Sequence, residues 1–254
     1  MRSDQPPKTL PMEYADIEFE NNAQRLPLVL CLDISSSMAG PPIQMLNDAL
    51  RGWTQELHDD VSLSYSVEVA VVTFGGQGVG AWKGPHLLDP RTPTSPFVPA
   101  HMFSSPQFVA SGVTLMTEAL ELTMRIVASR KAELRQSGLQ YYRPQICMVT
   151  DGLPTDATGH QTEAWRRLVP VLRAEQDARH FRFYAIGVGG ITERGEDVLR
   201  ALAPTFNARL QGFPFRELLQ MMSASANAEQ KGAGDEVFEK IFSQFKTQRP
   251  AWES

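Results

Sequence analysis

The sequence has few of the features that mark secreted, membrane-spanning or nucleic-acid-binding proteins. Two cysteines in 254 residues do not indicate a disulfide framework, and both stand in apolar runs where a small buried side chain fits. No run approaches the roughly 18 consecutive apolar residues of a membrane span, and the first residues lack the apolar core of a signal peptide. The net charge of -5 includes no block of like charges, which disfavours nucleic acid and anionic membranes. We therefore expect a cytoplasmic protein that binds neither.

Motifs of common enzyme classes are also missing. The five histidines show no metal-ligand spacing, and no P-loop lysine follows a glycine-rich loop. Neither 76–80 nor 187–190 completes a dinucleotide fingerprint that opens a helix, and no Gly-x-Ser-x-Gly elbow is present. A phosphotransferase built on Asp33 would need a second acid two residues later, where Ser35 stands. We expect a non-catalytic protein, and keep a metal-dependent phosphotransferase or phosphatase-like enzyme as the alternative.

The most informative stretch is an apolar run that ends in oxygen-bearing side chains. Five apolar residues, 28–32, predict a strand buried on both faces of a parallel sheet, with Asp33 at its carboxyl end. Loops at that end of an open α/β sheet form its ligand crevice. Asp33, Ser35 and Ser37 place oxygens at alternate positions, a set that suits Mg²⁺, Mn²⁺ or Ca²⁺ better than Zn²⁺. Taken alone, such a pattern is more often an ordinary helix N-cap.

A second strand repeats this pattern. Residues 145–150 form another strand-like run that leads to Asp151. Thr114 follows the glycine-containing stretch 111–113 and opens a predicted helix, so its hydroxyl either caps that helix or faces whatever Asp33 faces. Two strands that each deliver an aspartate are much less probable by chance than one, which strengthens the prediction of a metal site.

The alternation of strands and helices predicts a doubly wound α/β fold in one large domain. Further strands are expected at 66–74, 79–82, 181–187 and 208–211. Apolar residues at helical spacing predict helices within 43–57, 114–127, 163–179, 196–203 and 215–226, with a kink or break at Pro170.

The order of these signals resembles the metal-ion-dependent adhesion site of von Willebrand factor A (VWA) domains. Residues 33–37, Thr114 and 150–152 carry the resemblance, which covers roughly residues 24–228. Residues 25–38, 141–144, 150–156, 215–218 and 234–237 are similar to the bacterial TerY-like branch, which is associated with tellurite-resistance and stress-response gene clusters. The resemblance implies a Rossmann-like, mostly parallel six-stranded sheet in the order 3-2-1-4-5-6, with an antiparallel third strand and helices on both faces. The first and fourth strands are then neighbours beside one crevice.

The resemblance also implies a site and a function. Asp33, Ser35, Ser37, Thr114 and Asp151 would hold one divalent cation, directly or through water, with Mg²⁺ favoured and Mn²⁺ or Ca²⁺ as alternatives. Two carboxylates balance the ion and the neutral hydroxyls leave it electrophilic, so an Asp or Glu of a protein partner would complete its shell. The family association suggests kinases, phosphatases or other stress-cluster proteins as partners. The expected function is therefore that of a metal-dependent adaptor.

Some positions depart from the branch or invite other roles. Ser36, Val113 and Thr117 stand where glycine is common, although none of these changes removes a ligand oxygen. His160 and Asp156 follow the Asp151 loop, where roles as loop and turn residues outweigh contact with a ligand.

Three segments lie outside the regular pattern. We expect residues 1–23 to form an N-terminal tail and lead-in, 24–228 the VWA domain and 229–254 a C-terminal extension. The prolines of 84–110 predict a surface loop near the metal rim that carries recognition and does not join the sheet. The extension should form a helix with an apolar face of Val237, Phe238, Ile241, Phe242 and Phe245. Docking of this face on the protein's own body is favoured, and binding of a partner is the alternative.

Overall fold

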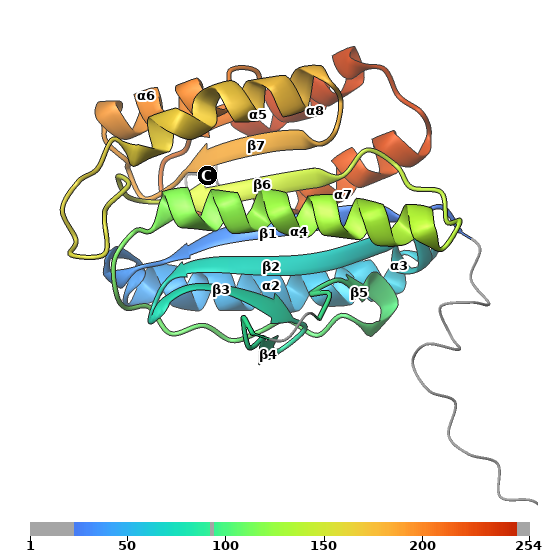
Figure 1. The fold of residues 1–254 in the computed structure, drawn as a ribbon, viewed down its shortest axis with the longest axis horizontal. Helices are drawn as coiled ribbons and strands as arrows, with labels where there is room; N and C mark the ends of the chain where they lie inside the picture. Colours follow the sequence, from blue (N-terminus) through green and yellow to red (C-terminus); the bar gives the residue numbers. More distant parts are fainter. Residues whose placement is uncertain (1–22, 92–93, 248–254) are drawn as a thin grey trace, which may run out of the picture.

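A single sheet with helices on both faces organises the chain (Figure 1). The structure is a computed structural model that describes residues 23–91 and 94–247. Within these residues the strands are β1 (Leu26–Ile34), β2 (Val67–Gly75), β3 (Gly78–Lys83), β4 (His86–Leu87), β5 (Val98–Pro99), β6 (Gln145–Thr150), β7 (Arg182–Gly187) and β8 (Asn207–Arg209). The α-helices are α2 (Pro41–Asp59), α3 (Val61–Ser66), α4 (Met116–Gln136), α5 (Leu168–Asp177), α6 (Glu193–Leu202), α7 (Phe215–Gln230) and α8 (Asp235–Thr247). Residues 1–22 of the predicted N-terminal tail lie outside the described residues.

The strand order confirms the predicted Rossmann-like topology. The sheet runs β4-β3-β2-β1-β6-β7-β8, with β1, β2, β6, β7 and β8 parallel and β3 antiparallel. The six expected strands stand in the expected order 3-2-1-4-5-6. The strand count is wrong by two, because the short strands β4 and β5 also join the sheet in the described part of the chain.

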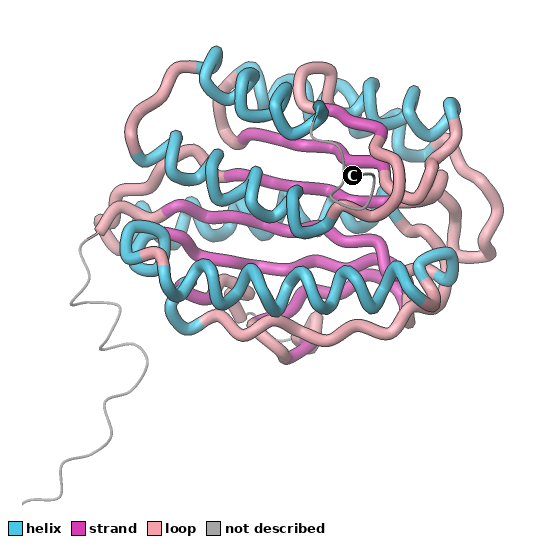
Figure 2. Tube along the Cα trace, turned by 180° about the vertical axis from the view of Figure 1, so that it is seen from behind, coloured by secondary structure: helices cyan, strands magenta, loops and turns pink. Residues whose placement is uncertain are grey.

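Two apolar cores explain why β1 is apolar at every position before Asp33. Leu28, Leu30 and Leu32 contribute to the core beneath α2, α7 and α8, whereas Val29 and Cys31 contribute to the core beneath α4, α5 and α6. Figure 1 shows the second set of helices on the near face of the sheet, and Figure 2 shows the first set from behind. A strand covered on both faces has no solvated side, so its alternate side chains are all apolar.

The segment 84–110 corrects one prediction. It joins the sheet through β4, which pairs with β3, and β5, which pairs with β2. Its aromatic side chains Phe97, Phe103 and Phe108 are buried in the cores. Pro99 is tolerated because β5 is a two-residue strand at the margin of the sheet, where a missing amide donor removes little pairing. The prediction of a surface loop outside the sheet is therefore wrong.

Helix boundaries also differ from expectation in two places. The short helix α3 was not predicted; Asp60 caps it by accepting hydrogen bonds from the amides of Ser62 and Leu63. The predicted helix 163–179 is divided, as expected, into a 3₁₀ turn, Ala164–Arg167, and α5, but the break lies before Leu168 and not at Pro170. Pro170 falls in the first turn of α5, where amides lack helical acceptors and the missing donor costs nothing.

The C-terminal helix α8 docks on the protein's own body. Phe238, Phe242 and Phe245 are almost completely buried, and the Phe242 ring centroid lies 5.8 Å from that of Tyr184 and 5.6 Å from that of Phe206. Three phenylalanines of the predicted apolar face therefore pack internally, as expected. Val237 was placed on that face incorrectly, since it remains 37% exposed.

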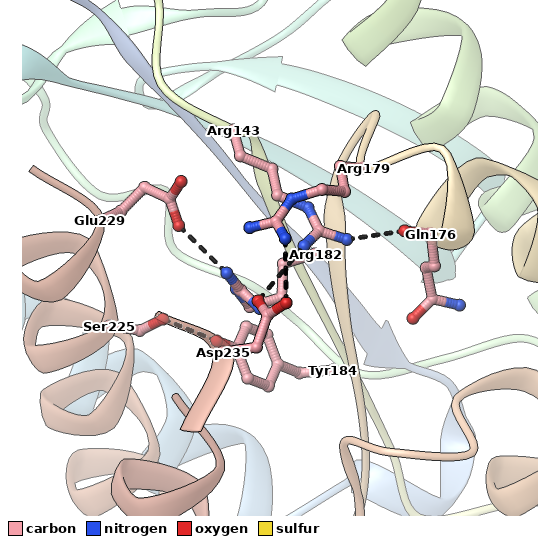
Figure 3. Close-up of polar contacts among 8 residues, drawn as sticks. All are labelled: Arg143, Gln176, Arg179, Arg182, Tyr184, Ser225, Glu229 and Asp235. Atoms are coloured by element: carbon pink, nitrogen blue, oxygen red, sulfur yellow. Dashed lines mark hydrogen bonds and ion pairs between the residues drawn. The ribbon is translucent and has the colours of Figure 1, made fainter. Parts of the chain in front are cut away.

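An ionic cluster holds the first turn of α8 against the sheet (Figure 3). Asp235 accepts hydrogen bonds of 3.1 Å from both Arg179 and Arg182, and Arg143 lies 3.8 Å from the same carboxylate. Arg182 also donates to Glu229 of α7 at 3.2 Å. Burial opposes ionisation of Asp235, but the Arg182 hydrogen bond and the nearby guanidinium charges outweigh it, so the pKa of Asp235 lies below its ordinary value. The cluster thus stabilises the docked position of α8.

Two further observations bear on the expected class of protein. Cys31 and Cys147 are buried free thiols, and burial raises the pKa of Cys31 to about 12, which keeps it unreactive. Within the described residues, no helix combines the length and the apolarity required to cross a membrane.

Candidate metal centre

Three loops meet at the carboxyl edge of the sheet, on the left in Figure 1. The Ser37 hydroxyl donates to Oδ1 of Asp151 at 2.7 Å and lies 3.1 Å from the Ser35 hydroxyl. The Thr114 hydroxyl donates to the Ser35 hydroxyl at 3.3 Å, and the Ser35 amide donates to Oδ1 of Asp33 at 2.8 Å. The structure therefore brings all five predicted site residues into one connected group of oxygens.

Glycines allow these loops to approach one another. Gly75, at the end of β2, has φ +118°, and a Cβ there would lie 2.5 Å from the carbonyl carbon of Ile34 and from the amide nitrogen of Ser35. Gly112 has φ +74° and lies against the backbone of Gly76, where a Cβ has no room. The carbonyl of Gly112 also accepts a 3.1 Å hydrogen bond from the Ser36 amide. Close backbone packing thus fixes the loop that carries Thr114 against the loop that carries Ser35.

Asp33 is a buried carboxylate that forms no salt bridge within the described residues. It is 1% exposed and accepts a 2.6 Å hydrogen bond from the Thr150 hydroxyl on its second oxygen. Burial raises the pKa of Asp33 to about 6; hydrogen bonds from Ser35 and Thr150 oppose the rise, and the charge of Asp151 adds to it. Burial also raises the pKa of Asp151, against a hydrogen bond from Ser37. In the described chain neither carboxylate forms a salt bridge, so their combined negative charge is left for another group to balance.

Two threonines position the site although sequence reasoning gave them no role. Thr150 orients Asp33 through the hydrogen bond already described. Thr155 holds Thr114 from both sides: its hydroxyl accepts from the Thr114 amide and its amide donates to the Thr114 carbonyl, both at 2.9 Å. Both threonines belong to the 150–156 motif around Asp151. A hydroxyl residue in a polar turn next to a site aspartate is the sequence feature that could have indicated their roles.

Residues near the site mostly have structural roles. Asp156 accepts hydrogen bonds from the amides of Thr158 and His160, which makes it the turn residue that was expected. The His160 ring is 2.7 Å from the Thr158 hydroxyl and belongs to the same exposed turn. Ser36 donates to the Gly112 carbonyl at 2.9 Å, so its side chain ties two loops together. Thr117 is buried on α4, and its hydroxyl has no partner among the described residues.

The oxygens of Ser35, Ser37, Thr114 and Asp151 have separations that fit a small divalent cation, and Asp33 is joined to this group through the Ser35 amide. In an octahedral shell with ligand distances of about 2.1 Å, neighbouring ligand oxygens lie about 3 Å apart, and the hydroxyl and carboxylate separations of 2.7, 3.1 and 3.3 Å bracket that spacing. Ser37 is exposed and Asp151 half-buried, so one side of the group opens to solvent. No group of three or more His, Cys, Asp or Glu side chains is placed to hold a metal in the described residues, so a cation here depends on the hydroxyls.

Comparison with known proteins identifies the fold. No family model matches the sequence, and no curated protein matches it either. Among solved structures, the vWF domain of the type V pili tip protein Mfa5 from Porphyromonas gingivalis aligns over 83% of this chain and 97% of its own, with a TM-score of 0.50 and 10% sequence identity. The chain has a VWA fold.

Two other proteins with similar structures, a pilus adhesin and a coat protein, are longer than this chain. The pilus adhesin SpaC from Lactobacillus rhamnosus GG aligns with a TM-score of 0.55 and 14% identity, over 80% of this chain and 31% of SpaC. The human COPII-coat protein Sec24c aligns with a TM-score of 0.50 and 10% identity, over 78% of this chain and 32% of its own. The chain thus spans about a third of these two proteins. At such identities the likeness shows the VWA fold and leaves the function to be argued from the site.

Proposed function

We propose that this protein is a non-catalytic VWA adaptor that holds one divalent cation and recruits a protein partner. A partner Asp or Glu would complete the coordination of the ion. The observation that carries the proposal is a hydrogen-bonded group of five oxygen-bearing side chains from three loops, two of which are carboxylates that form no salt bridge within the described residues. The donors are Asp33, Ser35, Ser37, Thr114 and Asp151.

The chemistry of the donors favours Mg²⁺, with Mn²⁺ or Ca²⁺ as alternatives. All five groups are hard oxygen ligands, and the approach to the site at Ser37 is open. Two carboxylates balance a divalent charge, so a third anion gains little in bulk water. It gains more at a partly desolvated interface, where the effective dielectric constant is lower. Contacts from the surrounding loops would supply the remaining affinity.

A metal-dependent phosphotransferase or phosphatase-like enzyme is the second candidate. The raised pKa of Asp33 favours it, because perturbed carboxylates gather at catalytic sites. Ser35 counts against it, because it stands where this chemistry needs a second acid. The Ser35 backbone amide also donates a hydrogen bond to Asp33. Metal-dependent release of phosphate from p-nitrophenyl phosphate, lost in Asp33→Asn, would favour the enzyme over the adaptor.

The cellular role extends the proposal beyond the fold. Similarity of the 25–38 and 150–156 motifs to the TerY-like branch supports a role in bacterial stress or tellurite response, with kinases, phosphatases or other stress-cluster proteins as partners. We place this function in the cytoplasm.

Partner capture by the immobilised protein should depend on the metal and on the site residues. We expect capture in Mg²⁺, loss of capture in EDTA, and at least a tenfold weakening in Thr114→Ala and Asp151→Ala, because each change removes one ligand oxygen. Neutralising one acidic residue of the partner should have the same effect. Asp197→Ala, which removes an exposed carboxylate from α6, is the matched control and should bind normally. Equal capture of the same partner in EDTA would contradict the adaptor proposal.

A further inference from the structure

An open groove lies between α2 and the first turn of α7, on the face of the sheet shown in Figure 2. It encloses about 530 Å³, a size typical of ligand-binding sites. Apolar side chains line it from both helices: Met45, half-buried Ala49 and buried Trp53 from α2, and Phe213 and buried Phe215 from the chain around the start of α7. Met45 is 42% exposed, so part of this apolar lining faces solvent.

A glycine in the middle of α2 keeps this groove open. Gly52 lines the groove, and a Cβ at this position would meet no atom within 4 Å, so packing does not require glycine there. Its place in the interior of a 19-residue helix makes glycine the least favourable residue apart from proline. The absence of a side chain thus weakens the helix and leaves the groove open at this position.

The groove begins next to the candidate metal centre. Gly189 separates the two: a Cβ on it would lie 2.7 Å from the Phe213 ring and 3.4 Å from Cβ of Asp151. A single short segment of a bound protein can therefore reach the cation and the groove together.

The charge around the groove selects the kind of segment. Three carboxylates, Asp48, Glu56 and Glu217, line it together with one guanidinium, Arg216. Arg216 lies 3.8 Å from Glu56, and Arg51 pairs with Asp48 at 3.1 Å. Glu217 forms no salt bridge within the described residues. The carboxylate of Glu217, unpaired in the described part of the chain and beside an apolar floor, complements a basic side chain next to an apolar one.

We propose that the groove binds a linear segment of the partner protein that carries an aromatic or large aliphatic residue next to a Lys or Arg, a few residues from the acidic residue on the cation. The apolar side chain fills the space left by Gly52, and the basic side chain pairs with Glu217. This proposal rests on the proposed adaptor function, whose cation anchors the same segment. The metal centre supplies the common anchor, and the groove supplies specificity.

Selection from a random 12-residue peptide display library in Mg²⁺ tests the proposal. Enriched peptides should share an acidic residue and, nearby, an apolar residue beside Lys or Arg. Binding of a synthetic peptide of the enriched sequence should be lost in EDTA, weakened at least tenfold by Gly52→Leu, and unchanged by Gly52→Ala, which adds too little volume to fill the groove. Both variants should have a raised Tm, because each replaces glycine inside a helix, so loss of binding in Gly52→Leu would not reflect unfolding.

A charge exchange gives a second test of the same groove. Glu217→Lys should weaken binding of the synthetic peptide. The same variant should bind a peptide in which the basic residue is replaced by Glu. Peptides that need Mg²⁺ but bind Gly52→Leu and Glu217→Lys normally would overturn the groove and leave the adaptor intact. Peptides that bind equally in EDTA, or no enrichment at all, would overturn both.

Discussion

Asp33→Asn should abolish divalent-cation binding and also make the metal-free protein more stable than the wild type. Asp33 is 1% exposed, and burial raises its pKa to about 6. The folded state therefore holds this proton to higher pH than the unfolded state. Ionisation of the buried Asp33 destabilises the folded state, and this destabilisation is absent below about pH 4, grows up to about pH 6 and is complete at neutral pH. Removing the charge should stabilise the metal-free protein by about 1 to 2 kcal/mol, since part of the gain is lost with the acceptor for Thr150.

Two measurements separate these effects. Urea unfolding at pH 7 in EDTA should show the higher stability of Asp33→Asn, and calorimetric titration with Mn²⁺ should show no binding to it. In the wild type, Mn²⁺ affinity should fall as the pH drops below about 6, because the ion competes with a proton. Asp197→Asn, an exposed carboxylate, should change neither quantity. A variant that binds Mn²⁺ like the wild type would show that Asp33 takes no part in the site.

Phe242→Ala should lower the free energy of unfolding by about 3 kcal/mol, the cost typical of emptying a buried phenylalanine site. Phe242 is 4% exposed and packs against the rings of both Tyr184 and Phe206, so its truncation leaves a cavity beneath α8. Urea unfolding would measure the change.

Deleting residues 233–254 should have a larger effect on stability than Phe242→Ala, because it uncovers apolar side chains of β7 and α7, and the truncated protein should be less soluble.

Val237→Ala is the matched control on the same helix. Val237 is 37% exposed, and its truncation should change the stability by less than about 0.5 kcal/mol. A stable, soluble truncated protein, together with a negligible effect of Phe242→Ala, would mean that α8 is a partner-binding appendage instead of part of the fold.

Periodic patterns in the sequence predicted the parts of the fold that are periodic. The apolar strand before Asp33 and the similar run before Asp151 predicted two buried neighbouring strands, and α2 followed from the spacing of Ile43, Leu46 and Leu50. The helical spacing of Phe238, Phe242 and Phe245, which are buried in α8, predicted that helix in the same way. In each case a long apolar stripe or run records burial directly in the order of residues.

The segment 84–110 could not be predicted because its buried residues follow no period. Phe103 packs against Trp53 and Phe108 against Trp82, whereas Phe97 is buried in the core on the other face of the sheet. The side chain of Asn47 in α2 donates to the Phe108 carbonyl at 2.9 Å and accepts from the Phe108 amide at 2.8 Å, a contact across 61 positions that no local pattern predicts.

At the site, sequence predicted which side chains would meet but not what positions them. Asp33, Ser35 and Ser37 stand close together in the chain, and Asp151 follows a strand of the same sheet. The supporting contacts of Thr150 with Asp33 and of Thr155 with Thr114 join residues from different elements. Such contacts depend on how the loops pack. The close backbone contacts at Gly75 and Gly112 determine that packing.

The position of a bound cation tests the central claim most directly. Crystals grown with Mn²⁺ and measured for anomalous scattering should show one strong peak at the carboxyl edge of the sheet. The peak should lie about 2.1 to 2.3 Å from the hydroxyl oxygens of Ser35 and Ser37, with Thr114, Asp33 and Asp151 bound directly or through water. The same crystals of Asp33→Asn should lack it. An anomalous peak elsewhere in the molecule, with none among these five side chains, would contradict the metal centre on which the adaptor function depends.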